Sequence, residues 1–111
     1  PILLTYPVPE TGWNIPYLNG KNILFNDGFK PLISTAFDKY KIRNKFVIDT
    51  LDSIGNHAKL FRSKPSKVFC DSYKPDRCVA QIDGVPFYND DNHPSDKGAA
   101  LIAEDLFRKI Q

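Results

Sequence analysis

An aspartate and a histidine, Asp90 and His93, lie three positions apart near the end of the chain. In such a pair the carboxylate accepts a hydrogen bond from one ring nitrogen, which fixes the tautomer and leaves the other nitrogen free to act as a base. A base of this kind activates a nucleophile, so the pair predicts nucleophilic catalysis with the attacking group elsewhere. Acidic loops with a histidine are also common as solvated turns, and the residues alone leave that alternative open.

A metal site is a weaker interpretation of the same loop. Asp90, Asp91 and His93 are possible ligands, but one histidine and two carboxylates would need further ligands from other parts of the chain. We therefore expect no metal and no cofactor, and Asp91 has no assigned role.

The segment after His93 predicts the helix that holds the loop. Ser95 is a good N-cap, and Asp96 favours the positive end of the helix dipole. An apolar stripe then predicts a helix over residues 96–109. Gly98 in its first turn costs helix stability, so a close approach of neighbouring backbone is expected there. The stripe consists of Ala99, Ile102, Ala103, Leu106 and Ile110.

Before the loop, two apolar runs at residues 78–82 and 85–88 surround Asp83 and Gly84. This dipeptide is a strong hairpin signal, and Pro86 makes the second run an edge strand or a short extension.

The first half of the chain predicts fewer elements. Residues 2–6 are apolar without alternation, which favours a strand covered on both faces. Residues 10–26 predict a long irregular loop, in which Trp13 and Tyr17 serve as anchors that pin it down rather than as functional groups. Residues 31–40 are weakly helical.

A clearer helix begins at Asn44, and residues 58–62 predict a short strand. His57 lies between them, where a histidine is more often a partner of a helix end than a catalyst.

Two cysteines, Cys70 and Cys78, flank a polar loop with a proline. Their spacing allows a disulfide, which would be worth roughly 2–3 kcal/mol and would indicate a compartment outside the cytosol. Zinc is not expected at this spacing, whereas two unrelated reduced thiols remain the alternative.

Composition narrows the class of protein. The 111 residues suffice for one domain, and the net charge of +2 comes from scattered basic residues, which gives little support to nucleic-acid binding. No apolar stretch approaches the ~20 residues of a membrane helix. The chain has no methionine and opens on an apparent strand, so we expect that upstream sequence has been removed. Any contact with a membrane is expected only through that region.

The order of these features resembles the C-terminal end of SGNH-type (GDSL-like) hydrolase domains. It is most similar to the domains that are fused to type 3 acyltransferases in bacterial enzymes that O-acetylate surface polysaccharides. Residues 3–16 also resemble the strand and loop that precede this end, whereas residues 20–68 match only in helix pattern. The residues that carry the resemblance are Cys70, Cys78, Asp83, Gly84, Phe87, Tyr88, Asp90, His93, Ser95, Gly98 and Ala99.

The resemblance implies an α/β fold, part of a flavodoxin-like three-layer α/β/α domain, with a Ser-His-Asp triad. His93 would be the general base and Asp90 its orienting partner. The Gly-Asp-Ser block of the family has no counterpart in this sequence, nor do its oxyanion-donor blocks, and Pro94 stands where the family often has leucine. Residues 1–111 would thus be the C-terminal portion of one domain.

The implied partners are an acyl donor, a saccharide acceptor and an upstream part of the same domain that supplies the serine. The parent would be a periplasmic O-acyltransferase or esterase, and this chain alone would be inactive. The alternative is a non-enzymatic extracytoplasmic binding or interaction module, in which Asp90 and His93 only form a polar loop.

Overall fold

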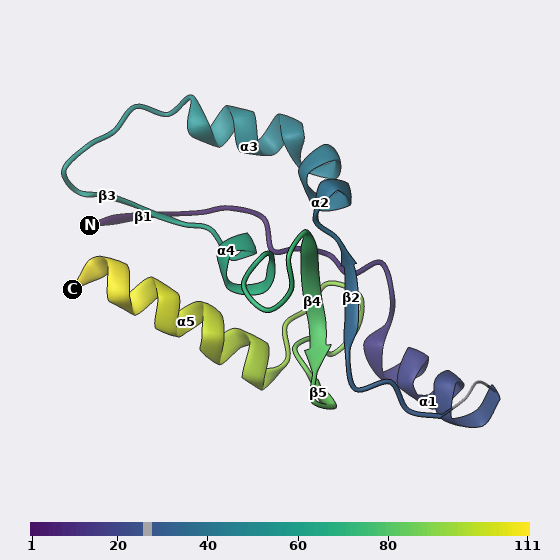
Figure 1. Ribbon diagram of the computed structural model, residues 1–111. Helices are drawn as coiled ribbons and strands as arrows, with labels where there is room; N and C mark the ends of the chain where they lie inside the picture. The colour runs from purple at the N-terminus through teal and green to yellow at the C-terminus, as the bar shows by residue number, and fades with distance from the viewer. Residues whose placement is uncertain (26–27) are drawn as a thin grey trace.

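The computed structural model describes residues 1–25 and 28–111, in which strands and helices are interspersed (Figure 1). The strands are β1 (Ile2–Thr5), β2 (Ile33–Ala36), β3 (Leu60–Ser63), β4 (Arg77–Ile82) and β5 (Val85–Pro86). The helices are α1 (Ile15–Phe25), α2 (Phe37–Arg43), α3 (Lys45–Asp52), α4 (Ser66–Phe69) and α5 (Asp96–Ile110). Among the described residues, no helix has the length and apolarity needed to cross a membrane.

The strands form two small sheets. β1 and β3 pair in parallel, with Ile2 opposite Leu60 and Thr5 opposite Ser63. β4 lies between β2 and β5 and is antiparallel to both. Helices and small sheets together make an α/β fold, as the sequence predicts.

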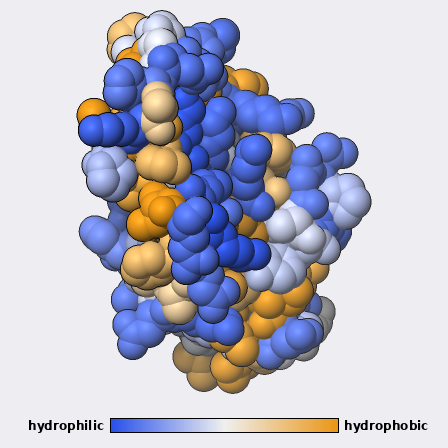
Figure 2. Space-filling model, turned by 90° about the vertical axis from the view of Figure 1, so that its left-hand side faces the viewer, coloured by the Kyte–Doolittle hydropathy of each residue, from blue (hydrophilic) through white to orange (hydrophobic). Residues whose placement is uncertain are grey.

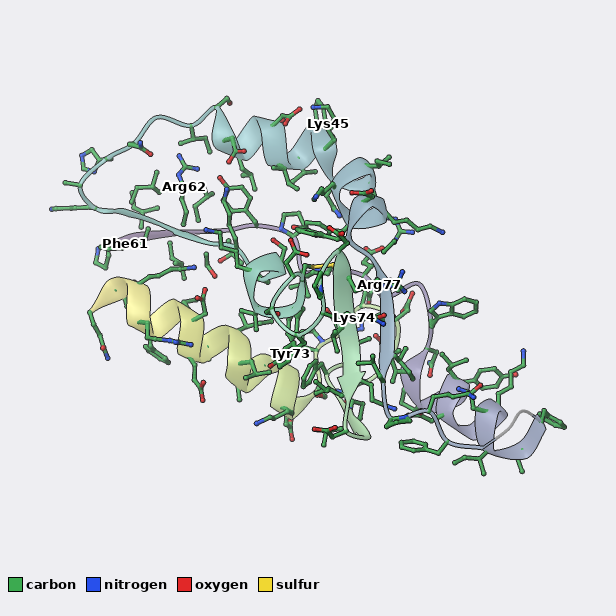
Figure 3. All side chains as sticks on the ribbon, viewed as in Figure 1. Lys45, Phe61, Arg62, Tyr73, Lys74 and Arg77 are labelled. Carbon is green, nitrogen blue, oxygen red and sulfur yellow. A yellow bond between two sulfur atoms is a disulfide. The ribbon has the colours of Figure 1, made fainter. Side chains whose placement is uncertain are left out.

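Helices flank strand β3 of the parallel pair on two sides. α5 runs along one side of β3, and the N- and C-termini lie at the same end of the molecule (Figure 1). On the other side Arg62 of β3 points toward α3 (Figure 3), where its Nη1 donates to the carbonyl of Leu51 and to the hydroxyl of Tyr6, both at 2.8 Å. The hydroxyl of Tyr6 donates in turn to Asp52, so one polar network joins the residue after β1 to β3 and α3.

The core is built around three aromatic rings from α4 and from the segment that follows β5. The ring of Phe69 lies 5.5 Å from that of Phe87 and 5.7 Å from that of Tyr88, and all three side chains are buried. The other buried members of this cluster are Ile15, Ile33, Val79 and Ala80. The core therefore lies directly beneath the segment that leads into the Asp90–His93 loop.

The C-terminal half follows its predictions. The hairpin forms as β4 and β5 around Asp83 and Gly84, and the predicted C-terminal helix is α5, one residue longer than expected. The predicted short strand is β3, which begins two residues later and ends one residue later than expected.

Two predictions for the first half are wrong. Residues 15–25 form helix α1 rather than irregular loop, because the side-chain oxygen of Asn14 caps the helix by accepting from the amide of Tyr17 at 3.0 Å. The prediction for residue 26 lies outside the described residues. Residues 33–36 are strand β2 rather than helix, since they pair with β4, and helix begins only at Phe37.

Burial also departs from prediction. Ile2 in β1 is 62% exposed, so this strand is not covered on both faces here. Figure 2 shows apolar groups interspersed with hydrophilic ones on the face nearest the chain ends. Phe107 of α5 is exposed too. The apolar stripe of α3 buries no residue. His57 lies beyond the end of α3 and accepts a hydrogen bond from the amide of Lys59 instead of serving a helix end.

Candidate catalytic loop

The candidate loop connects β5 to α5 and is closed at its base by backbone hydrogen bonds. The amide of Ser95 donates to the carbonyl of Phe87 at 2.9 Å, and the amide of Asn89 donates to the carbonyl of His93 at 2.8 Å. These bonds bring the two ends of the loop together, so the residues between them project as a short turn.

The start of α5 holds this closure in place. Ser95 Oγ donates to the carbonyl of Pro86 at 2.8 Å and accepts from the amide of Gly98 at 3.2 Å, which makes Ser95 the predicted N-cap. A Cβ at Gly98 would lie 2.1 Å from the carbonyl oxygen of Phe87. The expected close approach of backbone is therefore present, and it requires glycine.

The outer side of the loop is tied to the segment between β1 and α1. The amide of Thr11 donates to the carbonyl of Asp91 at 2.9 Å, and Thr11 Oγ1 lies 3.1 Å from the same oxygen. The buried hydroxyl of Tyr88 donates to the carbonyl of Pro9 at 2.7 Å. Contacts between residues some 80 positions apart in the sequence thus hold the loop on a second side.

Asp90 and His93 form the expected pair. His93 Nδ1 lies 2.6 Å from Asp90 Oδ2, while Asp90 Oδ1 accepts from the amides of Asn92 at 2.9 Å and His93 at 2.7 Å. The side chain of His93 is 77% exposed. Among the described residues, no group hydrogen-bonds to Nε2, so this nitrogen is accessible to a substrate or to another residue.

The pair shifts the pKa of both members. The backbone N–H groups of His93 and Asn92, followed by the ring of His93, lower the pKa of Asp90 to about 2. The hydrogen bond and charge of Asp90 raise the pKa of His93 above its usual value, and the charge of Asp91 adds to this in the same direction. Asp90 is therefore ionised at neutral pH, and a histidine beside it is a stronger base than a free one.

The described residues supply no nucleophile to this pair. Within residues 1–25 and 28–111 no serine hydroxyl is hydrogen-bonded to His93, and Ser95, which is nearest in sequence, is occupied as the helix cap. Nor does this part of the chain hold a group of three or more histidine, cysteine or acidic residues able to bind a metal ion.

The two cysteines are joined. Cys70 and Cys78 form a disulfide at the start of β4, as predicted. The bond closes the loop of residues 71–77, which also contains a backbone hydrogen bond from Asp71 to Arg77. Cys70 and Cys78 pack with Tyr40 in a second, smaller buried cluster, so the disulfide supports β4 rather than the Asp90–His93 loop directly.

Sequence reasoning missed Thr11 as a support of the loop and Asn14 as the cap of α1. Asn14 followed by Pro16 is a recognisable start of a helix, since proline is tolerated in the first turn. Thr11 had no such signal, because its partner Asp91 is distant in the sequence.

Fold and loop together define an α/β domain that carries a hydrogen-bonded His–Asp pair at the start of its last helix. A family model described as SGNH domain (fused to AT3 domains) matches residues 1–108. The chain therefore belongs to the SGNH domain family of the kind fused to acyltransferase-3 proteins. No curated protein and no solved structure matches the chain significantly.

Proposed function

We propose that this chain is the C-terminal portion of an SGNH-type O-acyltransferase or esterase domain, in which His93 is the general base and Asp90 orients it. The observation that carries the proposal is the 2.6 Å contact between His93 Nδ1 and Asp90 Oδ2, which leaves Nε2 unoccupied and directed away from its partner. This is the hydrogen-bonding arrangement that activates a serine hydroxyl.

The nucleophilic serine comes from sequence outside this chain. His93 Nε2 takes the proton of its hydroxyl as the oxygen attacks the carbonyl of an ester or thioester. The leaving group departs with that proton, and an acyl-serine forms. His93 then deprotonates a sugar hydroxyl or water, which attacks the acyl-serine and regenerates the free hydroxyl. Asp90 stabilises the imidazolium at both stages, since its pKa of about 2 keeps it ionised.

The proposed acceptor is a cell-surface polysaccharide, and the proposed location is the periplasm, or the extracytoplasmic face of a bacterial inner membrane. Fusion of the family to acyltransferase-3 domains supports the acyl-transfer chemistry. The Cys70–Cys78 disulfide is compatible with that location, because disulfides persist mainly in oxidising compartments.

The test is ester hydrolysis and acyl transfer by the intact protein that contains this chain. His93→Ala should lower kcat/KM for an activated acetyl ester by about 10²- to 10⁴-fold, and Asp90→Asn should lower it strongly too. His57→Ala is the matched control, because His57 is exposed and lies outside the loop. Near-normal rates in both loop variants would reject the assignment and favour a binding module.

The isolated chain provides a second test. Residues 1–111 alone should show no ester hydrolysis that depends on His93, because no serine of the described residues reaches it. Hydrolysis by this chain that His93→Ala abolishes would place the nucleophile within it and would contradict the proposal.

A further inference from the structure

A cavity of about 360 Å³ is lined in part by Thr11, which is hydrogen-bonded to the catalytic loop, and it plays no part in the chemistry described above. Its walls come from the segment between β1 and α1, from β2, from α2 and from the start of β4. The size falls within the range of about 300–1,000 Å³ typical of small-molecule sites. The lining residues with charged or aromatic side chains include Glu10, Trp13, Lys39, Tyr40, Arg43 and Arg77.

Thr11 connects this cavity to the loop. Thr11 lines the cavity, and its amide donates to the carbonyl of Asp91, two residues before His93, while its hydroxyl oxygen lies 3.1 Å from the same carbonyl oxygen. The hydroxyl also donates to the carbonyl of Trp13 at 2.7 Å, which holds the next lining residues in a tight turn. One wall of the cavity is therefore hydrogen-bonded directly to the segment that carries the base.

The charge of the cavity is predominantly positive. Lys39, Arg43 and Arg77 line it against one carboxylate, Glu10, which is 3.0 Å from Arg43. Within residues 1–25 and 28–111, neither Lys39 nor Arg77 forms an ion pair. Two cations facing one cavity without carboxylate partners favour an anionic ligand.

Arg77 is held in place before any ligand arrives. Its Nε donates to Ser34 Oγ at 2.9 Å and one Nη donates to the carbonyl of Ser34 at 2.7 Å, so the guanidinium is fixed between β4 and β2 (Figure 3). The remaining guanidinium nitrogen has no partner among the described residues. A guanidinium fixed in this way loses little freedom when it binds a carboxylate.

An aromatic surface lies at the same cavity. Trp13 lines it and is 57% exposed, which is unusual for so large an apolar side chain. An exposed indole offers a flat face on which the apolar face of a sugar ring can stack, and its N–H can donate to a hydroxyl. Lys39 and Arg77 would then bind a negative group on the same sugar.

We propose that this cavity is the acceptor subsite for an acidic saccharide, with the sugar on Trp13 and its carboxylate on Lys39 and Arg77. The inference rests on the proposed function, which it extends by naming the acceptor as a carboxylate-bearing polysaccharide rather than a neutral one. The subsite selects the acceptor by charge.

The experiment is titration calorimetry of the intact protein with a galacturonate trisaccharide and with its neutral methyl ester. The acidic trisaccharide should bind at least tenfold more tightly, and Lys39→Gln and Arg77→Gln should each weaken it by about tenfold, as expected for a hydrogen bond to a charged group. Trp13→Ala should weaken the binding of both the acidic and the neutral trisaccharide. Lys41→Gln, also on α2 but paired with Asp38 and outside the cavity, should change neither.

Three results would count against this subsite. Equal binding of the acidic and neutral sugars, or equal effects of Lys39→Gln and Lys41→Gln, would overturn the proposal. Inorganic phosphate that competes as well as the trisaccharide would make the cavity a simple anion site and would also overturn it. Lys39 is exposed, so its variant tests the proposal even if Arg77→Gln unfolds the chain. Binding should survive His93→Ala, so failure of this subsite and failure of the catalytic assignment are separate outcomes.

Discussion

Asp90 binds His93 through both of its carboxylate oxygens. Oδ2 lies 2.6 Å from the ring nitrogen Nδ1, and Oδ1 accepts the backbone N–H of His93 at 2.7 Å. One carboxylate thus fixes both the backbone and the ring of the histidine. Because the two residues are three positions apart, the pair is a local feature of the loop, and its position relative to the rest of the domain depends on other contacts.

The pair predicts the pH dependence of the reaction. His93 must be neutral to take a proton, so kcat/KM should rise with pH through the pKa of His93, which Asp90 raises above the usual value of about 6.5. Asp90→Asn removes the charge, and the midpoint of this rise should move to lower pH while the maximal rate falls. The measurement is kcat/KM for an activated ester between about pH 5 and 9.

Asp91→Asn is the control for that profile. Asp91 also raises the pKa of His93, but it is the smallest of the contributions, so its variant should shift the midpoint in the same direction by less. An unchanged midpoint in Asp90→Asn would mean that the histidine responsible for the profile is not His93.

The same two shifts affect folding stability. The raised pKa of His93 adds stability that is lost as pH rises through that pKa, and the lowered pKa of Asp90 adds stability that is lost as pH falls toward about 2.

Gly98→Ala should destabilise the chain and distort the loop. Its Cβ would lie 2.1 Å from the carbonyl oxygen of Phe87, which is buried backbone and cannot move aside cheaply, so a loss of roughly 1–3 kcal/mol in the free energy of unfolding is expected. Gly20→Ala is the matched control. Gly20 is also helical, but a Cβ added there would have no other atom within 4 Å. The substitution should therefore stabilise α1 by roughly 0.5–1 kcal/mol. Denaturant unfolding measures both, and equal effects would contradict the close approach.

Thr11→Val should loosen the loop by removing a hydroxyl that contacts Trp13 and Asp91. We expect a loss of about 1 kcal/mol in the free energy of unfolding and faster hydrogen exchange at the amides of residues 89–93. Thr11→Ser keeps the hydroxyl and should retain slow exchange. Identical exchange in the two variants would show that the hydroxyl does not support the loop.

Removal of the disulfide should lower stability without altering the His93–Asp90 pair. Cys70 and Cys78 close a short loop, worth roughly 2–3 kcal/mol in the loop-entropy model, so the double variant Cys70→Ala/Cys78→Ala should have a lower Tm. The pKa of His93, followed by NMR titration, should stay raised, because its cause is Asp90. A Tm equal to that of the unmodified chain would mean that the disulfide constrains little.

The first-half predictions failed for two different physical reasons. Gly20 and Pro16 suggested a loop, yet proline is compatible with the first turn of a helix, and α1 buries Ile15 in the core, which compensates for the glycine. β2 is a strand because it pairs with β4 more than 40 positions later, and pairing over that distance is invisible to local periodicity.

The sequence by itself determined what depends on near neighbours. Ser95 caps the helix that follows it, Asp83 and Gly84 turn the hairpin, and Asp90 binds His93, since each acts over a few positions. Only the tertiary structure decided which parts of the chain meet. It brings Thr11 to the carbonyl of Asp91 and places Arg77 and Lys39 around one cavity, because such contacts follow from the packing of the sheets and helices rather than from spacing along the chain.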